Sequence, residues 1–221
     1  MAATGTPVKA GPPTPEDILD AAEWCFLHTG VSDTSVALIA ARARCARSLV
    51  NYHFPSFCNI LDEVLQRGRC RLRDHLLRVH GSQRQLLPSL RSALQLWLND
   101  VIHNDRVRAV QEILAFRCDL GRLPAHILDQ QIKESAEVLA LLRSIARDAK
   151  KAHELREDVC AESWASILGL LVSGAVRLCL MQRSQEARIE SWRAATRAVD
   201  AAFMLAAPVR AAGQVPALEN G

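Results

Sequence analysis

Residues 30–65, GVSDTSVALIAARARCARSLVNYHFPSFCNILDEVL, decide the fold of this chain. In the first half of the stretch, apolar residues recur at the i, i+3, i+4 and i+7 spacing of one helix face, at Val36, Ile39, Ala40 and Ala43. Three residues before them offer side-chain oxygens to the first free amides of that helix: Asp33, Thr34 and Ser35. A helix this short is not stable alone, so we expect it to pack against its neighbours.

A second short helix is predicted after a break at Arg44–Cys45. Residues 46–52 turn Leu49 and Val50 inward, which leaves an outer face of Arg47, Ser48 and Asn51. Phe54-Pro55 ends this helix, because the residue before a proline avoids the helical region. Two short helices joined by a tight turn, the second with a basic and polar outer face, are typical of the helix-turn-helix motif of DNA-binding proteins.

The stretch resembles the DNA-binding segment of the TetR family of bacterial transcription regulators. The resemblance rests on TSVALIAARA and ARSLVNYHFPS and covers about the first quarter to third of the chain. In that family the second helix of the motif enters the major groove of DNA. The resemblance therefore implies phosphate contacts by Thr34, Ser35, Tyr52 and His53, and base contacts by Arg47, Ser48 and Asn51. Arg44, in the turn, completes the predicted DNA-binding set.

Three positions depart from the pattern usual in the family. Arg44 stands where a glycine is usual, so the turn is either strained or differently shaped, since a non-glycine residue at positive φ costs about 1 kcal/mol or more. Ala46 replaces a serine and removes a helix cap, and Phe57 replaces a lysine and removes a phosphate contact. For two residues an alternative to DNA contact stays open: His53 can be a structural residue packed on Phe54, and Arg47 can be a solvated surface residue.

Composition favours helices over a sheet. The chain has 221 residues, enough for one or two domains, with 5% aromatic residues and few glycines. The net charge is only +3, but arginines outnumber acids between residues 42 and 78. Such a local excess of positive charge is what phosphate binding requires.

The seven cysteines are odd in number, widely spread and never in a C-x-x-C pair. No apolar run that would mark a signal peptide stands near residue 1. We therefore expect reduced thiols and a cytoplasmic location. Cys45 and Cys58 flank the second helix of the motif, and a redox role for them stays open.

The chain as a whole is predicted to be all-α, with about nine helices. We expect a disordered start (1–13), a three-helix DNA-binding head (14–55), a helical body for effector binding and dimerisation (56–207) and a flexible tail (208–221). Residues 56–79 read as one connecting helix, because apolar residues continue at helical spacing from Ile60 to Leu76.

Two predicted helices near the end of the chain indicate how the body packs and dimerises. Residues 163–181 are apolar nearly all round; a buried helix is favoured over a membrane span, because Arg177 interrupts the run. The helix from about residue 185 to 207 has a 3.5-residue seam, predicted to be the dimer interface, at Ile189, Trp192, Thr196, Val199 and Phe203. The alternative is that this seam packs on its own subunit.

The residues that point to chemistry are few. The sequence has no P-loop and no G-x-G-x-x-G, H-E-x-x-H or G-x-S-x-G motif, so we expect no enzyme, catalytic residue, metal or cofactor. Candidates for lining an effector pocket are Trp97, His103, Phe116, Cys118 and Trp164, although core packing explains such residues equally.

These observations predict a homodimeric regulator that binds double-stranded DNA. Two-fold symmetry would place two recognition helices about 34–36 Å apart and would require a palindromic operator. An apolar or amphipathic small molecule bound to the body would release the DNA. The alternatives are a ligand-binding or protein-interaction module with a degenerate head and, as a third class, an enzyme.

Overall fold

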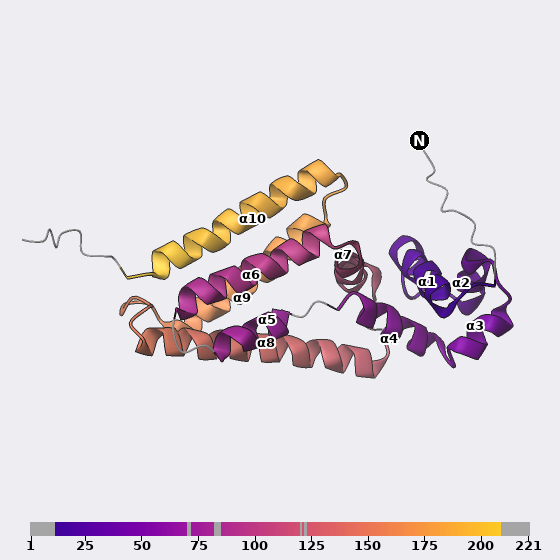
Figure 1. Ribbon diagram of the computed structural model, residues 1–221, viewed down its shortest axis with the longest axis horizontal. Helices are drawn as coiled ribbons and strands as arrows, with labels where there is room; N and C mark the ends of the chain where they lie inside the picture. The colour runs from indigo at the N-terminus through magenta and orange to yellow at the C-terminus, as the bar shows by residue number, and fades with distance from the viewer. Residues whose placement is uncertain (1–11, 70–71, 82–84, 120, 122, 209–221) are drawn as a thin grey trace, which may run out of the picture. The chain divides into compact units, whose positions relative to one another are not determined.

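A computed structural model describes residues 12–69, 72–81, 85–119, 121 and 123–208, and every regular secondary-structure element within these ranges is a helix (Figure 1). The helices are α1 (Pro15–Thr29), α2 (Val36–Ala43), α3 (Arg47–His53), α4 (Phe57–Arg67), α5 (Leu72–His80), α6 (Leu86–His103), α7 (Asp105–Glu112), α8 (Ala125–Lys151), α9 (Ala161–Leu180) and α10 (Gln185–Ala206), with a π-helical turn, η1 (Ile113–Arg117), after α7. The all-α prediction is confirmed. The expected disordered start and flexible tail lie almost wholly outside the described residues.

The chain divides into two compact units. We call residues 1–69 and 105–130 the head unit, and residues 70–104 and 131–221 the body unit. The boundary expected at residue 56 lies inside the head unit, which also includes α4, α7, η1 and the first turns of α8. The motif is therefore supported by more of the chain than its first three helices.

The core of the head unit is built from segments far apart in the sequence. Thr14 and Asp17 begin α1 with a reciprocal capping box, and Pro15 occupies its first position. The inner face of α1 packs with α2 and α3 into one apolar cluster, which also contains Ile113 and Ile127. Because these two residues come from η1 and α8, the motif rests on helices that follow it by more than fifty residues.

The segment predicted as one connecting helix contains two helices, so the expectation over residues 56–79 was wrong. α4 ends at Arg67, and α5 begins at Leu72. Gly68 lies directly on the backbone of α7, where an added Cβ would stand 2.3 Å from the carbonyl oxygen of Arg106. Only a residue without a side chain fits at this crossing, and glycine is a poor helix former.

In the body unit, α6, α9 and α10 pack against one another, and α5 packs on α6 (Figure 1). Glu154 holds the start of α6: its two carboxylate oxygens accept hydrogen bonds from the amides of Leu86 and Leu87, at 3.0 and 2.8 Å. A carboxylate at this end of a helix also complements the helix dipole. Asp200 of α10 accepts a hydrogen bond from Arg91 of α6, which joins the two helices.

Among the described helices, only α9 is long and apolar enough to cross a membrane. Of its most apolar 18-residue segment, 44% is buried in the protein. The buried side includes Trp164, Leu168 and Val172. The opposite side leaves four large apolar residues exposed, at Ile167, Leu170, Leu178 and Met181, which we call the apolar stripe. The expectation of a helix buried on most sides is therefore wrong for one face.

The crossing at Gly68 predicts an unequal response to two glycine-to-alanine substitutions. Gly68→Ala should lower the free energy of unfolding by about 2 kcal/mol or more, because the new Cβ meets backbone atoms that cannot rotate away. Gly169→Ala, in α9, is the matched control: its Cβ would meet Leu142 at an ordinary 3.6 Å, so helix propensity should raise stability by about 0.5–1 kcal/mol. Urea unfolding of both variants tests this, and equal effects would contradict the close packing.

Candidate nucleic-acid interface

The turn between α2 and α3 has the shape that helix-turn-helix motifs require, in spite of its arginine. Arg44 adopts a left-handed backbone, with φ 55° and ψ 42°. Its amide donates to the carbonyl oxygens of Ala40 and Ala41, and the Cys45 amide donates to Ala40 at 3.0 Å. Of the two alternatives left by the sequence, the turn is strained rather than differently shaped.

Helix α3 presents four of its seven side chains to solvent, and Leu49, predicted to point inward, is half-buried. Among its seven residues only Val50 is buried, at 0% exposure, and Phe54 directly after the helix is buried as well. Arg47, Ser48 and Asn51 are exposed, as predicted for the outer face. The ring of Tyr52 is 81% exposed, and its neighbour His53 is half-buried against Tyr52 and Phe54.

The two predicted phosphate contacts at the start of α2, Ser35 and Thr34, differ in exposure. Ser35 caps the helix: its Oγ accepts from the Leu38 amide at 3.2 Å, and the exposed hydroxyl can still donate its hydrogen. Thr34 is only 8% exposed, and its hydroxyl donates to the Gly30 carbonyl at 2.7 Å. A phosphate oxygen can only accept a hydrogen bond, so in this structure the Thr34 hydroxyl has no hydrogen left for one, and its phosphate contact stays a prediction.

The other two departures from the family pattern also have structural outcomes. Ala46 stands at the N-cap of α3 and makes no side-chain cap. Phe57, the first residue of α4, packs edge-to-face on Phe26 of α1, with ring centroids 5.7 Å apart. The residue that replaces the usual lysine thus contributes apolar packing to the head core.

A cluster of charges ties α4 and α7 to α1 inside the head unit. The Arg67 side chain is 8% exposed and forms ion pairs with Glu16, at 3.0 Å, and with Asp20. Arg106 of α7 meets the same Asp20 at 3.7 Å. Burial raises the pKa of the nearby Glu23 carboxyl, in spite of the opposing charge of Arg67. The burial of Arg67 was not predictable from local sequence, because the three acids beside it, Glu16, Asp20 and Glu23, lie more than forty residues earlier in α1.

The surface of α1 also carries an aromatic stack that no sequence pattern indicated. The guanidinium of Arg42, on α2, lies 4.1 Å from the ring centroid of Trp24, and His28 stacks on the same ring at 4.1 Å. A cation over an indole ring is attracted to its face, so this contact helps to fix α2 against α1.

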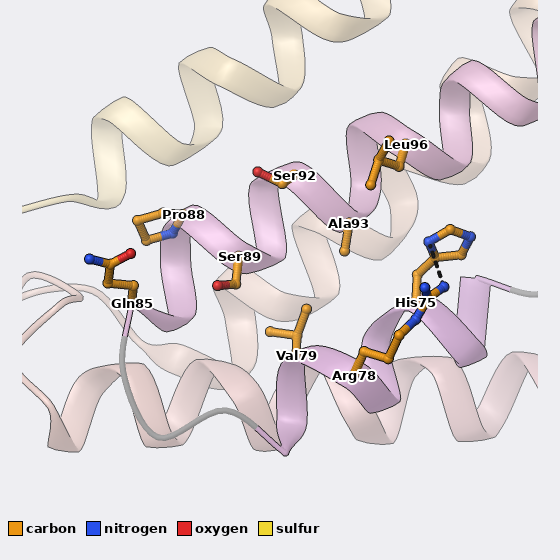
Figure 2. Close-up of a pocket in the computed structure, with 9 residues that line it drawn as sticks. All are labelled: His75, Arg78, Val79, Gln85, Pro88, Ser89, Ser92, Ala93 and Leu96. Carbon is orange, nitrogen blue, oxygen red and sulfur yellow. Dashed lines mark hydrogen bonds between the residues drawn. The ribbon is translucent and has the colours of Figure 1, made fainter.

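The five candidate effector residues are divided between the two units. Trp97, His103 and Trp164 belong to the body unit, whereas Phe116 and Cys118 belong to the head unit. Trp97 and Trp164 are buried in the core, and the Trp164 indole donates to the Ala202 carbonyl at 3.2 Å. Burial raises the pKa of the Cys118 thiol to about 11, which keeps it neutral. The structure instead has a groove of about 410 Å³ between α5 and α6, lined by none of the five (Figure 2).

The predicted dimer seam on α10 packs largely within its own subunit. Val199 is 0% exposed, Phe203 is buried edge-to-face on Trp164, and Trp192 packs edge-to-face on His103. Thr196 donates its hydroxyl to the Trp192 carbonyl, and Ile189 is half-buried. The periodicity was real, but its partners are α6 and α9 of the same chain, so Val199 and Phe203 are not available to a second subunit.

The described cysteines are all free thiols: Cys25, Cys45, Cys58, Cys118, Cys160 and Cys179. Cys70 lies outside the described residues. Burial raises the pKa of Cys45, so its reactive thiolate form is disfavoured at neutral pH.

Comparison with known proteins identifies the family to which this chain belongs. Residues 18–64, from α1 to α4, match the family described as bacterial regulatory proteins, tetR family. The HTH-type transcriptional repressor BepR of Brucella suis biovar 1 (strain 1330) is 30% identical over 166 residues, which are 73% of this chain and 78% of the relative. The chain belongs to the TetR family. As a TetR-family protein it is a DNA-binding transcriptional regulator, and the alternative of a degenerate head is not favoured.

Other members share most of the length of this TetR-family regulator. TtgR of Pseudomonas putida is 25% identical over 170 residues, which are 76% of this chain and 80% of the relative. A SmeT–triclosan complex superimposes with a TM-score of 0.71 at 25% identity, over 87% of this chain and 91% of the other. NalD of Pseudomonas aeruginosa has a TM-score of 0.72 at 20% identity, over 88% and 98%, and shows the shared fold.

The strained turn predicts that Arg44→Gly stabilises the protein. Glycine adopts positive φ without a Cβ penalty, so the free energy of unfolding should rise by up to about 1 kcal/mol. Arg47→Gly, with a helical backbone in α3, is the control and should lose about 1 kcal/mol. Urea unfolding of the two variants tests this; a less stable Arg44→Gly protein would show that the turn is not strained.

Proposed function

We propose that this protein is a dimeric repressor that binds a palindromic operator through α3. The observation that carries the proposal is the solvent-facing surface of α3, which is held to the core by Val50 and exposes a guanidinium, an amide and a phenol side by side. Arg47 and Asn51 have the donor groups that pair with guanine and adenine edges, whereas Tyr52 and Ser35 suit phosphate oxygens. His53 and Arg44 flank this surface and complete the proposed DNA-binding set, together with Ser48.

The dimer is proposed to form through the apolar stripe of α9. Its four residues recur at helical spacing on one face, and Leu170 is 75% exposed. An exposed row of large apolar side chains is costly in water and is typical of an interface. A second subunit related by two-fold symmetry would supply a second copy of α3, one for each half of a palindromic operator. Half-buried Ile189, Trp192 and Thr196 would border that interface rather than form its centre.

The proposed inducer is an apolar or amphipathic small molecule. SmeT, a relative of 25% identity over most of the chain, has been solved as a complex with triclosan. By analogy, a ligand of that character bound to the body would favour a spacing of the two heads that fits DNA poorly. Such a regulator would act in the cytoplasm, where its operator is.

Loss of one α3 side chain should weaken operator binding. Arg47→Ala should cost about 1–3 kcal/mol of DNA affinity, because a charged hydrogen-bond donor is lost from the groove. Arg183→Ala removes the same charge at an exposed position between α9 and α10 and should leave affinity nearly unchanged. Fluorescence anisotropy on the upstream DNA at two salt concentrations measures both. Equal affinities of wild type and Arg47→Ala would remove Arg47 from the interface.

A charge in the apolar stripe should separate the subunits. Leu170→Glu should give a monomer, because dimerisation would bury an unpaired carboxylate. Ile132→Glu is the matched control: Ile132 is exposed on α8, outside the stripe, and its variant should remain a dimer. Size-exclusion chromatography with light scattering distinguishes the two. A dimeric Leu170→Glu protein would assign the interface to another surface.

A further inference from the structure

The groove between α5 and α6 has the two kinds of surface that an amphipathic ligand needs. Its lining comes from both helices: His75, Arg78, Val79, Gln85, Pro88, Ser89, Ser92, Ala93 and Leu96. Figure 2 shows His75 and Arg78 together at one end of the groove and Gln85 and Pro88 at the other. The volume of about 410 Å³ is within the range of small-molecule sites.

The apolar part of the lining is formed by Val79, Ala93 and Leu96, and Figure 2 shows Leu96 on the same side of the groove as His75. Val79 and Ala93 are buried and form the floor, and the side chain of Leu96 is 58% exposed beside them. Leu96 follows Ala93 by one turn of α6, so the two side chains continue along one face of the helix. A ligand that covered Leu96 would remove apolar surface from water, which favours binding of a hydrocarbon chain or an aromatic ring.

The charged end of the groove contains an arginine without a carboxylate partner among the described residues. Arg78 donates from Nε to the Asp74 carbonyl at 3.2 Å, and its Nη2 lies 3.2 Å from His75 Nδ1. Arg73, on the same helix, differs: its Nε contacts Glu137 at 2.6 Å. Arg78 therefore keeps donors that can still take an anion in the bidentate manner typical of arginine.

The groups beside Arg78 do not neutralise its positive charge. The His75 ring lies between Arg78 and Asp100, whose carboxylate is 3.8 Å from His75 Nε2. Burial, with the adjacent guanidinium, lowers the pKa of His75, so the ring is neutral at physiological pH. Ser89 and Ser92 add two hydroxyl groups that make no hydrogen bond with any described residue, and each can donate to an oxygen of a ligand.

We propose that this groove binds an anionic amphiphile. The singly charged head group, a carboxylate or a comparable anion, would pair with Arg78, and its apolar body would lie over Val79, Ala93 and Leu96. Head and tail are thus matched to the charged part and the apolar part of one groove on the body unit. That such a ligand is also the inducer rests on the proposed function, whereas the binding itself does not.

Binding is tested with decanoate as the probe, below its critical micelle concentration, by isothermal titration calorimetry on the full chain. Decyltrimethylammonium has the same tail and the opposite charge, and it should bind at least about tenfold more weakly, because Arg78 would repel it. One site per subunit is expected. Equal affinity for the two probes would overturn the proposal, because tail burial alone would then explain the binding.

Three variants locate the site. Arg78→Gln should weaken decanoate binding by about tenfold, since the ion pair is lost. Ser92→Trp should abolish the binding of both probes, because an indole at this exposed position fills the groove. Arg183→Gln carries the same change of charge outside both helices and should bind decanoate within about twofold of wild type. Unchanged binding in either groove variant would overturn the assignment.

A DNA-binding measurement on the same proteins separates this inference from the proposed function. Without decanoate, Arg78→Gln and Ser92→Trp should bind the operator as wild type does, because neither residue lies in the head unit. Failure of decanoate to bind, with normal DNA affinity, would refute the groove and leave the repressor intact. Specific decanoate binding by a protein that ignores its operator would refute the repressor and leave the groove intact.

Discussion

The burial of Val50 is the contact on which the DNA-binding surface depends. A helix of seven residues is far too short to persist alone, and Val50 is the only residue of α3 that is fully enclosed. With this side chain in the core formed by α1, α2 and α4, Arg47, Ser48, Asn51 and Tyr52 are left facing solvent. The left-handed Arg44 before it and Phe54 after it fix the entry and the exit of the helix.

Local patterns predicted the motif correctly because its signals are local. The apolar spacing in α2, the break at Arg44–Cys45 and the proline after Phe54 each act within a few residues, and the helix bounds agree with them. Contacts between distant segments were not predictable in this way. The break at Gly68 depends on the approach of Arg106, nearly forty residues later, and the burial of Arg67 depends on acids near the start of the chain.

The body unit shows a second limit of periodicity. A regular apolar seam indicates that a helix has a packing face, but it does not indicate whether the helix that packs on this face belongs to the same subunit. On α10 that face packs on α6 and α9 of the same chain. The exposed apolar surface lies on α9, whose sequence is apolar on nearly all sides, so no periodicity distinguished its exposed face from its buried face. Aromatic residues were likewise poor guides to a ligand site, because Trp97 and Trp164 fill the core. The groove is formed instead by α5 and α6, and it was not predictable because residues 56–79 were expected to form one helix, without a separate α5.

Selection of bound duplexes from a random DNA library by the full-length protein tests the central claim most directly. If the outer face of α3 reads the major groove in a two-fold symmetric dimer, sequencing should recover an inverted repeat. Its half-sites should be centred about 10 base pairs apart, or a near multiple of that distance. Recovery of duplexes with no enriched sequence, or of a single half-site without its inverted copy, would contradict this account.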